Sequence, residues 1–258
     1  MAANPARVFI TGASTGLGEA LARHYALRGA QVGLVARNRA RVDALAASLP
    51  GALSYACDVR DLEAVRAAAA YFIEQRGLPD LVIANAGISH GTLTEYAEDA
   101  AVFRDILEVN VMGMVHTFQP FVAAMRERGT GQLAGIASVA GLRGLPGASA
   151  YSASKAAAIR YLEALRVELH GSGVAVSTVC PGYVATPMTA RNPYPMPFLL
   201  EADDAARRIA RTIDARRRYA IVPWQMAIVG RIMGLLPAGA FEWLAARSGR
   251  KPRRAPGI

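Results

Sequence analysis

The sequence predicts an α/β fold, in which a doubly wound parallel sheet of about seven strands carries helices on both faces. Short apolar runs alternate along the chain with longer stretches of helical pattern. The short runs are apolar throughout rather than at every second position, which is typical of strands buried on both faces. With 258 residues, the chain has the length of one large domain and is short for two.

The predicted elements follow one another in a regular order. Seven runs predict strands: 7–11 (RVFIT), 31–36 (QVGLVA), 53–59 (LSYACDV), 80–87 (DLVIANAG), 132–141 (QLAGIASVAG), 174–182 (VAVSTVCPG) and 219–223 (YAIVP). Helical patterns lie between them at 17–28, 40–48, 61–76, 99–127, 151–170 and 201–217. Crossovers between parallel strands are right-handed, and ligands of such sheets bind at the carboxyl ends of the strands.

The positive charge of the chain is spread over several segments. A formal net charge of +9 raises nucleic acid, anionic membranes and phosphorylated ligands as partners. The basic clusters at 37–41, 216–218 and 247–254 are not interleaved with aromatic residues or a recognition motif, so we expect no nucleic-acid binding. Cys57 and Cys180 form no CxxC pair and the four histidines show no ligand spacing, so no metal site is expected.

The first residues and the cysteines predict a cytoplasmic protein. MAANPARVFITG runs directly into a predicted strand, without the charged and apolar segments of a secretory signal. Two separated cysteines suggest no disulfide framework, which fits a reducing compartment.

A glycine-rich loop follows the first predicted strand. TGASTGLG places Gly12, Gly16 and Gly18 between this strand and the next helix. The spacing is not GxGxxG, and no Lys-Ser/Thr pair follows as in a Walker A loop. Glycines at this place let backbone N–H groups approach a pyrophosphate at the helix N-terminus, which predicts a dinucleotide site. A β–α turn that needs only positive φ would explain the same glycines.

The end of the second predicted strand indicates which dinucleotide is bound. A carboxylate there would accept the ribose 2′-OH of NAD. VGLVARNRAR instead has Arg37 in that region, and no acid before Asp43. Because arginine can hold a 2′-phosphate through charge-assisted hydrogen bonds, the sequence favours NADP(H). Arg37, Arg39 and Arg41 would also fit the solvated start of a helix.

A tyrosine and a lysine begin the predicted helix at 151–170. Tyr151 and Lys155 are four residues apart and therefore share one helix face. Because a nearby ammonium favours the phenolate, Lys155 is expected to lower the pKa of Tyr151 toward the range of a general acid/base. Ser138, at the end of a predicted strand, brings a hydroxyl to the same sheet edge, where it could bond a substrate oxygen.

These motifs, in this order, resemble the classical short-chain dehydrogenase/reductase family over residues 7–222. The resemblance adds DV at 58–59, NAG at 85–87, LEVNVMG around Asn110 and PGYVATPM at 181–188 to the residues above. It implies a Rossmann-like fold, a nicotinamide cofactor and a catalytic tetrad of Asn110, Ser138, Tyr151 and Lys155. Ala84 departs from the family, which often has another asparagine there. The difference affects a structural contact rather than the catalytic residues.

The resemblance also implies a role for each member of the tetrad. In the family the tyrosine protonates the carbonyl oxygen during reduction, and the serine orients the carbonyl. The lysine binds the nicotinamide ribose and tunes the tyrosine, while the asparagine supports a water relay. The loop and the resemblance together predict these cofactor contacts: Gly12, Ser14, Thr15, Gly16, Leu17, Gly18, Arg37, Asp58, Val59, Asn85, Ala86, Gly87, Tyr151, Lys155, Pro181, Gly182 and Thr186.

We therefore expect a single dinucleotide-binding and catalytic domain over 1–258, with a substrate loop at 183–200 and a C-terminal extension at 223–258. The loop is rich in apolar side chains, which predicts a hydrophobic substrate. The expected substrate contacts are Ser138, Tyr151, Tyr183, Met188, Met196 and Phe198. Packing of the loop onto the domain would explain its composition nearly as well.

The predicted function is that of an NADP(H)-dependent oxidoreductase that interconverts a carbonyl and a secondary alcohol on a hydrophobic small molecule. A 3-oxoacyl-thioester reductase, acting on acyl carrier protein or coenzyme A thioesters, is an alternative within the family. A non-catalytic NADP(H)-sensing protein is an alternative of another class, although such a protein has no need of Tyr151 and Lys155 together.

The C-terminal extension is apolar and then basic. Between Pro223 and Pro237 there are too few residues for a membrane span, and Arg231 interrupts them. A helix at the substrate mouth, a subunit interface and a surface anchor toward anionic lipid all fit, the anchor being the least favoured. The family resemblance implies a homodimer or homotetramer.

Overall fold

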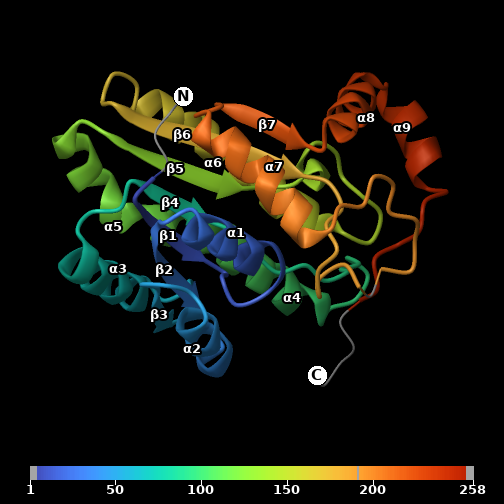
Figure 1. The fold of residues 1–258 in the computed structure, drawn as a ribbon. Helices are drawn as coiled ribbons and strands as arrows, with labels where there is room; N and C mark the ends of the chain where they lie inside the picture. The colour runs from blue at the N-terminus through green and yellow to red at the C-terminus, as the bar shows by residue number, and fades with distance from the viewer. Residues whose placement is uncertain (1–4, 191, 254–258) are drawn as a thin grey trace.

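The structure, a computed structural model, describes residues 5–190 and 192–253. Its centre is one parallel sheet in the strand order β3-β2-β1-β4-β5-β6-β7 (Figure 1). The strands are β1 (Arg7–Thr11), β2 (Gln31–Ala36), β3 (Leu53–Ala56), β4 (Leu81–Ala84), β5 (Gly131–Ile136), β6 (Val174–Pro181) and β7 (Tyr219–Val222). The order reverses between β1 and β4, which places a ligand crevice at their carboxyl ends. The predicted fold class is confirmed.

Helices cover both faces of this sheet. They are α1 (Gly16–Leu27), α2 (Arg39–Ala47), α3 (Leu62–Arg76), α4 (Asp99–Leu107), α5 (Gly113–Arg128), α6 (Ser149–Glu168), α7 (Ala202–Asp214), α8 (Trp224–Leu235) and α9 (Ala238–Ala245). Helices α1, α2 and α7 contribute to one core cluster, and α3, α5 and α6 to the other. The sheet therefore has a buried core on each side.

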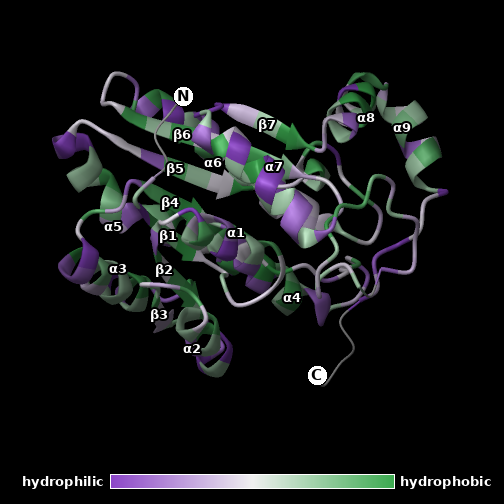
Figure 2. Cartoon of the chain, viewed as in Figure 1, coloured by the Kyte–Doolittle hydropathy of each residue, from purple (hydrophilic) through white to green (hydrophobic). Residues whose placement is uncertain are grey.

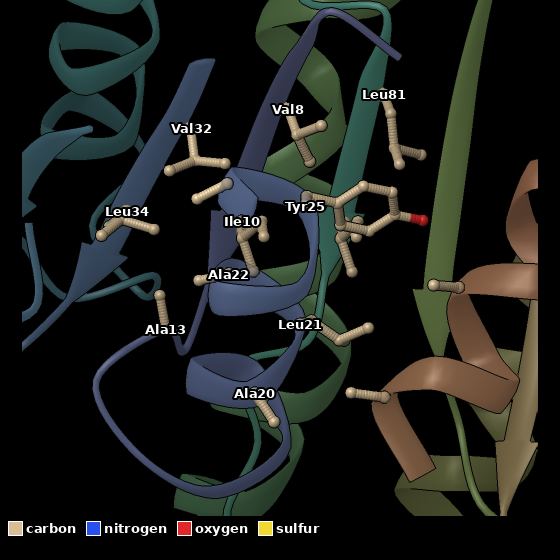
Figure 3. Close-up of a cluster of buried hydrophobic side chains, with 14 of the residues drawn as sticks. Val8, Ile10, Ala13, Ala20, Leu21, Ala22, Tyr25, Val32, Leu34 and Leu81 are labelled. Carbon is tan, nitrogen blue, oxygen red and sulfur yellow. The ribbon is translucent and has the colours of Figure 1, made fainter. Parts of the chain in front are cut away.

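Strand β1 shows why the predicted strands are apolar throughout. Val8 and Ile10 belong to the cluster beneath α1, where Figure 3 shows them among the side chains of that helix. Phe9 points to the other cluster and packs on Phe72 and Phe121, with ring centroids 5.6 and 5.0 Å apart. Because both faces are covered, neither set of alternate positions can be polar.

The predicted helix at 99–127 is interrupted. A π-helical turn, η1 (Glu108–Met112), separates α4 from α5. Such turns add a residue to the helical repeat and frequently lie at functional sites. A hydrophobic pattern of period 3.6 does not reveal this turn, which carries Asn110 into the interior with no exposed surface.

Helices α8 and α9 form a corner at the β7 side of the sheet (Figure 1). Figure 2 shows both as largely hydrophobic. Met226 and Gly230 of α8 face inward, toward Gly182 and Leu142. The outer face of α8 is apolar and exposed, and Trp224 keeps 65% of its surface. Within the described ranges, no helix is both long and apolar enough to cross a membrane.

Candidate active site

A cavity of about 630 Å³ opens at the carboxyl edge of the sheet. Every residue predicted to contact a cofactor lines it, from Gly12 at the end of β1 to Thr186 after β6. Ser138, Tyr151 and Lys155 line the same cavity. The predicted cofactor loop and three members of the predicted tetrad therefore meet at one place.

The glycine loop is fastened to the strand beside it. The Asn85 amide donates hydrogen bonds to the backbone oxygens of Thr11 and Gly12, both at 3.1 Å. Helix α1 begins at Gly16, and its first turn, with the positive end of the helix dipole and N–H groups that the helix itself does not satisfy, forms part of the cavity wall. A Cβ at Gly18 would lie 2.1 Å from the Gly12 oxygen, so only glycine allows the helix to approach the loop this closely.

A positive side chain lies at the end of β2. Arg37 is exposed and lines the cavity together with Arg41 of α2. Asp58, after β3, is paired with Arg60 at 2.8 Å. Burial alone would raise the pKa of Asp58, but hydrogen bonds and charge from Arg60, with a contribution from Arg37, hold it below its ordinary value. This end of the cavity therefore carries arginine charge, with its nearby carboxylate already neutralised by Arg60.

Ser138, Tyr151 and Lys155 surround the other end of the cavity. Ser138 caps a short 3₁₀ turn after β5, and its hydroxyl accepts a hydrogen bond from the Ala140 N–H at 3.1 Å. Tyr151 and Lys155 stand on successive turns of α6, with the Lys155 Nζ atom 5.8 Å from the Tyr151 ring centroid. The Lys155 ammonium is buried and donates to the Ile136 carbonyl at 2.9 Å.

The pKa of Tyr151 is shifted in the direction opposite to the prediction. Burial raises it, and hydrogen bonding to Ser138 offsets only part of that effect. Burial also lowers the pKa of Lys155 to about 8. The predicted direction is therefore wrong for this structure, because desolvation of the phenolate dominates the pKa of Tyr151, while Lys155 directs its ammonium at the Ile136 carbonyl. Tyr151 holds its proton at neutral pH, which is the form of a proton donor.

Asn110 supports the site from beneath. Its amide oxygen accepts from the Ile88 N–H at 2.8 Å, and its amide nitrogen donates to the Ile88 carbonyl and to the Ser154 hydroxyl. Asn110 does not line the cavity itself. It ties the segment after β4 to helix α6, which carries Tyr151.

The segment after β6 contributes only part of the predicted substrate contacts. Pro181, Gly182, Thr186 and Met188 line the cavity. The other loop residues predicted for substrate contact, Tyr183, Met196 and Phe198, do not. Tyr183 packs near Tyr194, as expected if this part of the loop packs on the domain. Phe198 is half exposed.

The arrangement agrees with the comparison with known families. The family model described as short chain dehydrogenase matches residues 6–195, which is most of the chain.

The chain belongs to the short-chain dehydrogenase/reductase family.

Relatives of this short-chain dehydrogenase carry oxidoreductase names. A protein of Myxococcus xanthus (strain DK1622), described as an uncharacterized oxidoreductase, is 39% identical over 92% of this chain and 95% of its own length. Ketoacyl reductase HetN of Nostoc is 37% identical over 69% of this chain and 63% of its own length. The short-chain dehydrogenase described here is therefore an oxidoreductase of a family that uses a nicotinamide cofactor.

Solved structures share the fold over nearly the whole chain. A short-chain dehydrogenase/reductase from Burkholderia phymatum, in complex with NAD, matches with a TM-score of 0.81 and 25% identity, covering 100% of both chains. An alcohol dehydrogenase from the archaeon Thermococcus sibiricus, complexed with 5-hydroxy-NADP, matches with a TM-score of 0.75 and 28% identity, over 84% of this chain and 95% of that one. The two neighbours hold different nicotinamide cofactors.

The cavity of this short-chain dehydrogenase contains residues that sequence reasoning did not assign to it. Arg41 is one of them. Its position near the start of the predicted helix that follows Arg37 could have indicated that it lies beside Arg37 at the cavity. The others are mostly apolar wall residues without a motif of their own: Ala36, Asn38, Cys57, Ile88, Val109, Ile136, Ala137, Val184, Pro187 and Thr189.

Replacing Asn110 tests its structural contribution to this short-chain dehydrogenase. We expect Asn110→Ala to lower the free energy of unfolding by about 2 kcal/mol, because the part-buried N–H and carbonyl of Ile88 lose their side-chain partner. The Ser154 hydroxyl would keep only its bond to the Tyr151 carbonyl. Chemical denaturation of the variant and the wild type measures this difference. Equal denaturation midpoints and slopes would contradict the supporting role.

Proposed function

We propose that this protein is an NADP(H)-dependent oxidoreductase that interconverts a carbonyl and a secondary alcohol on a hydrophobic small molecule, with Tyr151 as general acid/base. The observation that carries the proposal is the single cavity lined by the glycine loop, by Arg37 and by Ser138, Tyr151 and Lys155. The glycine loop and Arg37 would hold a dinucleotide in the cavity whose wall also contains the three polar side chains.

The residues present fit a nicotinamide dinucleotide. The α1 N-terminus and the close approach at Gly18 form a cradle for a pyrophosphate. Arg37 and Arg41 favour the phosphorylated cofactor, because the residues at the end of β2 are Ala36, Arg37 and Asn38 rather than a carboxylate that would accept a free 2′-OH. When bound, the cofactor supplies or accepts the hydride at the carbonyl carbon.

The chain's own residues manage the proton and the position of the substrate. In the reducing direction, the Tyr151 hydroxyl gives its proton to the carbonyl oxygen, which becomes the alcohol. The Ser138 hydroxyl orients that oxygen by a hydrogen bond. The Lys155 ammonium stabilises the phenolate that Tyr151 leaves, which is protonated again from solvent before the next cycle.

Reversing the charge at Arg37 tests the choice of cofactor. We expect Arg37→Asp to weaken NADPH binding roughly tenfold to a hundredfold, since a charge-assisted hydrogen bond is lost and a repulsion introduced. NADH binding should stay equal or improve. Fluorescence titration with each cofactor measures both affinities.

Arg39→Asp is the matched control for this experiment. It makes the same change of charge two residues away, at a position that does not line the cavity. Equal weakening by both variants would mean that net charge alone acts, and unchanged NADPH affinity in Arg37→Asp would contradict the assignment.

Reduction of 3-oxoacyl thioesters is a second candidate. The relative named ketoacyl reductase favours it, since it is 37% identical over 69% of this chain. Activity on carrier-bound or coenzyme A thioesters, with none on free ketones, would select this candidate over the first.

NADPH consumption by the purified protein tests the proposal directly. The panel consists of hydrophobic ketones, aldehydes and 3-oxoacyl thioesters, with NADH run in parallel. Turnover that is lost in Tyr151→Phe supports the enzyme. Tight NADPH binding without turnover of any member would instead favour a cofactor-sensing protein.

We also propose a cytoplasmic location. We propose that the protein forms a homodimer or homotetramer, and the exposed face of α8 is one candidate contact between subunits. Light scattering after size-exclusion chromatography would determine the assembly.

A further inference from the structure

Lysine is rare in this chain, and its two occurrences lie at one place. Of the 29 basic residues, 27 are arginine, and the lysines are Lys155 and Lys251. The Nζ atom of Lys155 lies 5.8 Å from the Tyr151 ring centroid, and that of Lys251 lies 5.6 Å from it. Lys155 belongs to the reaction centre already described, whereas Lys251 comes from the far end of the chain.

Lys251 belongs to a segment, residues 249–253, that we call the C-terminal strap. Figure 1 shows it running from α9 back toward α4, beside the loop that follows β6. The Gly91 N–H donates to the Pro252 oxygen at 2.9 Å. A Cβ at Gly91 would lie 2.4 Å from the Lys251 oxygen, so glycine is needed for this close approach. The strap therefore packs on the segment that follows β4.

Arg253 anchors the far end of the strap. Its guanidinium binds both carboxylate oxygens of Asp99, at 2.8 and 3.0 Å, and Glu98 at 2.8 Å. It also lies 3.4 Å from the centroid of the Tyr96 ring. This combination of bidentate pairing and stacking holds a planar guanidinium in one orientation. The strap is thus fixed on both sides of Lys251.

The strap also meets the loop after β6. Gly249 packs against Tyr194, because a Cβ added at Gly249 would lie only 2.7 Å from the Tyr194 Cβ. Burial raises the pKa of Tyr194 to about 12, with smaller contributions from Tyr183 and Tyr151. Strap and loop therefore meet at Gly249 and Tyr194, and Lys251 brings the strap to Tyr151, a residue of the cavity wall. Gly249, Tyr194 and Lys251 are not themselves part of that wall.

The ammonium of Lys251 is partly desolvated, and no carboxylate of the described residues compensates the lost hydration. No hydrogen bond or carboxylate pairs with its ammonium in residues 5–190 and 192–253, in contrast to Arg253 two residues away. Burial lowers the pKa of Lys251 to about 8, which leaves it mostly charged at neutral pH. A half-buried ammonium beside a reactive phenol is a place where a ligand anion gains a strong interaction.

We propose that Lys251 is the anion-binding residue of the substrate site, and that the substrate is an oxo- or hydroxy-carboxylate with a hydrophobic remainder. The carboxylate lies against the Lys251 ammonium while the reacting carbonyl faces Tyr151. This inference rests on the proposed function for the reaction but names its substrate class. A carboxylate held this close to Tyr151 is separated from the reacting carbon by a short spacer.

Binding of an unreactive pair of probes tests the inference without turnover. The probes are 4-phenylbutyrate and its neutral amide, titrated by calorimetry into the full-length protein saturated with NADP⁺. Wild type is expected to bind the acid roughly tenfold to a hundredfold more tightly than the amide, as for a hydrogen bond to a charged group. In Lys251→Met this preference should disappear, and in Lys251→Arg most of it should remain.

Each outcome has a separate meaning. Equal binding of acid and amide by wild type, no binding of the acid at millimolar concentration, or a preference that survives in Lys251→Met would overturn the inference. NADPH affinity, measured in each variant, shows that the site remains folded, and a merely structural role would not alter the ratio of acid to amide. If the protein prefers the acid but shows no turnover, the anion site is supported and the proposed reductase function is contradicted. If it shows turnover without preferring the acid, the reductase function is supported and the anion site is contradicted.

Discussion

Tyr151→Phe is expected to lower kcat by roughly 10²- to 10⁴-fold, while NADPH affinity stays nearly unchanged. The substitution removes one hydroxyl and keeps the ring, so packing of the partly buried side chain on α6 is preserved. The cofactor contacts expected at the glycine loop and at Arg37 lie elsewhere in the cavity. The lost rate is therefore the contribution of proton transfer to the carbonyl oxygen. Steady-state kinetics and a fluorescence titration with NADPH measure the two quantities.

Tyr183→Phe is the matched control. It removes the same hydroxyl from a tyrosine of the loop that follows β6, at a position outside the cavity wall. We expect its kcat to remain close to that of wild type. A Tyr151→Phe variant that keeps its rate would remove Tyr151 from the reaction and transfer the proton donor to another group.

The fold could be predicted because the local sequence and the global packing agree. Strand β1 is short, apolar at every position and followed by glycines, and each of these features has one structural cause. Val8 and Ile10 pack in the core on one side of the sheet, and Phe9 packs in the core on the other side. The meeting of Tyr151 and Lys155 at the cavity was predictable for a similar reason, since one helix fixes the two residues relative to each other.

Other features depend on contacts that no local pattern encodes. The π-helical turn carries Asn110, whose side chain is hydrogen-bonded to Ile88 and Ser154, residues distant in sequence. The direction of the Tyr151 pKa follows from burial, a property of the assembled site rather than of the Tyr-x-x-x-Lys spacing. Lys251 lies far from Tyr151 in the sequence, in a segment whose composition indicates only that it is basic.

Gly18→Ala is expected to lower the free energy of unfolding by about 3 kcal/mol and to abolish measurable NADPH binding. The new Cβ would lie 2.1 Å from the Gly12 oxygen and 2.4 Å from the Asn85 amide nitrogen. Neither neighbour can yield without breaking the hydrogen bonds by which Asn85 holds Thr11 and Gly12. The loop and the start of α1 must separate, and the pyrophosphate cradle is lost with them. Thermal unfolding should show a Tm lower by roughly 6–12 °C.

Gly234→Ala separates this effect from the general consequence of adding a methyl group to a helical glycine. Gly234 lies in α8, and a Cβ there meets nothing within 4 Å. Since alanine has the higher helix propensity, this control is expected to be neutral or slightly stabilising. If Gly18→Ala behaved in the same way and still bound NADPH, the loop would have room for a side chain. The closeness of Gly18 to Gly12 would then be unrelated to cofactor binding, and the dinucleotide would have to be held chiefly by Arg37 and the far wall of the cavity.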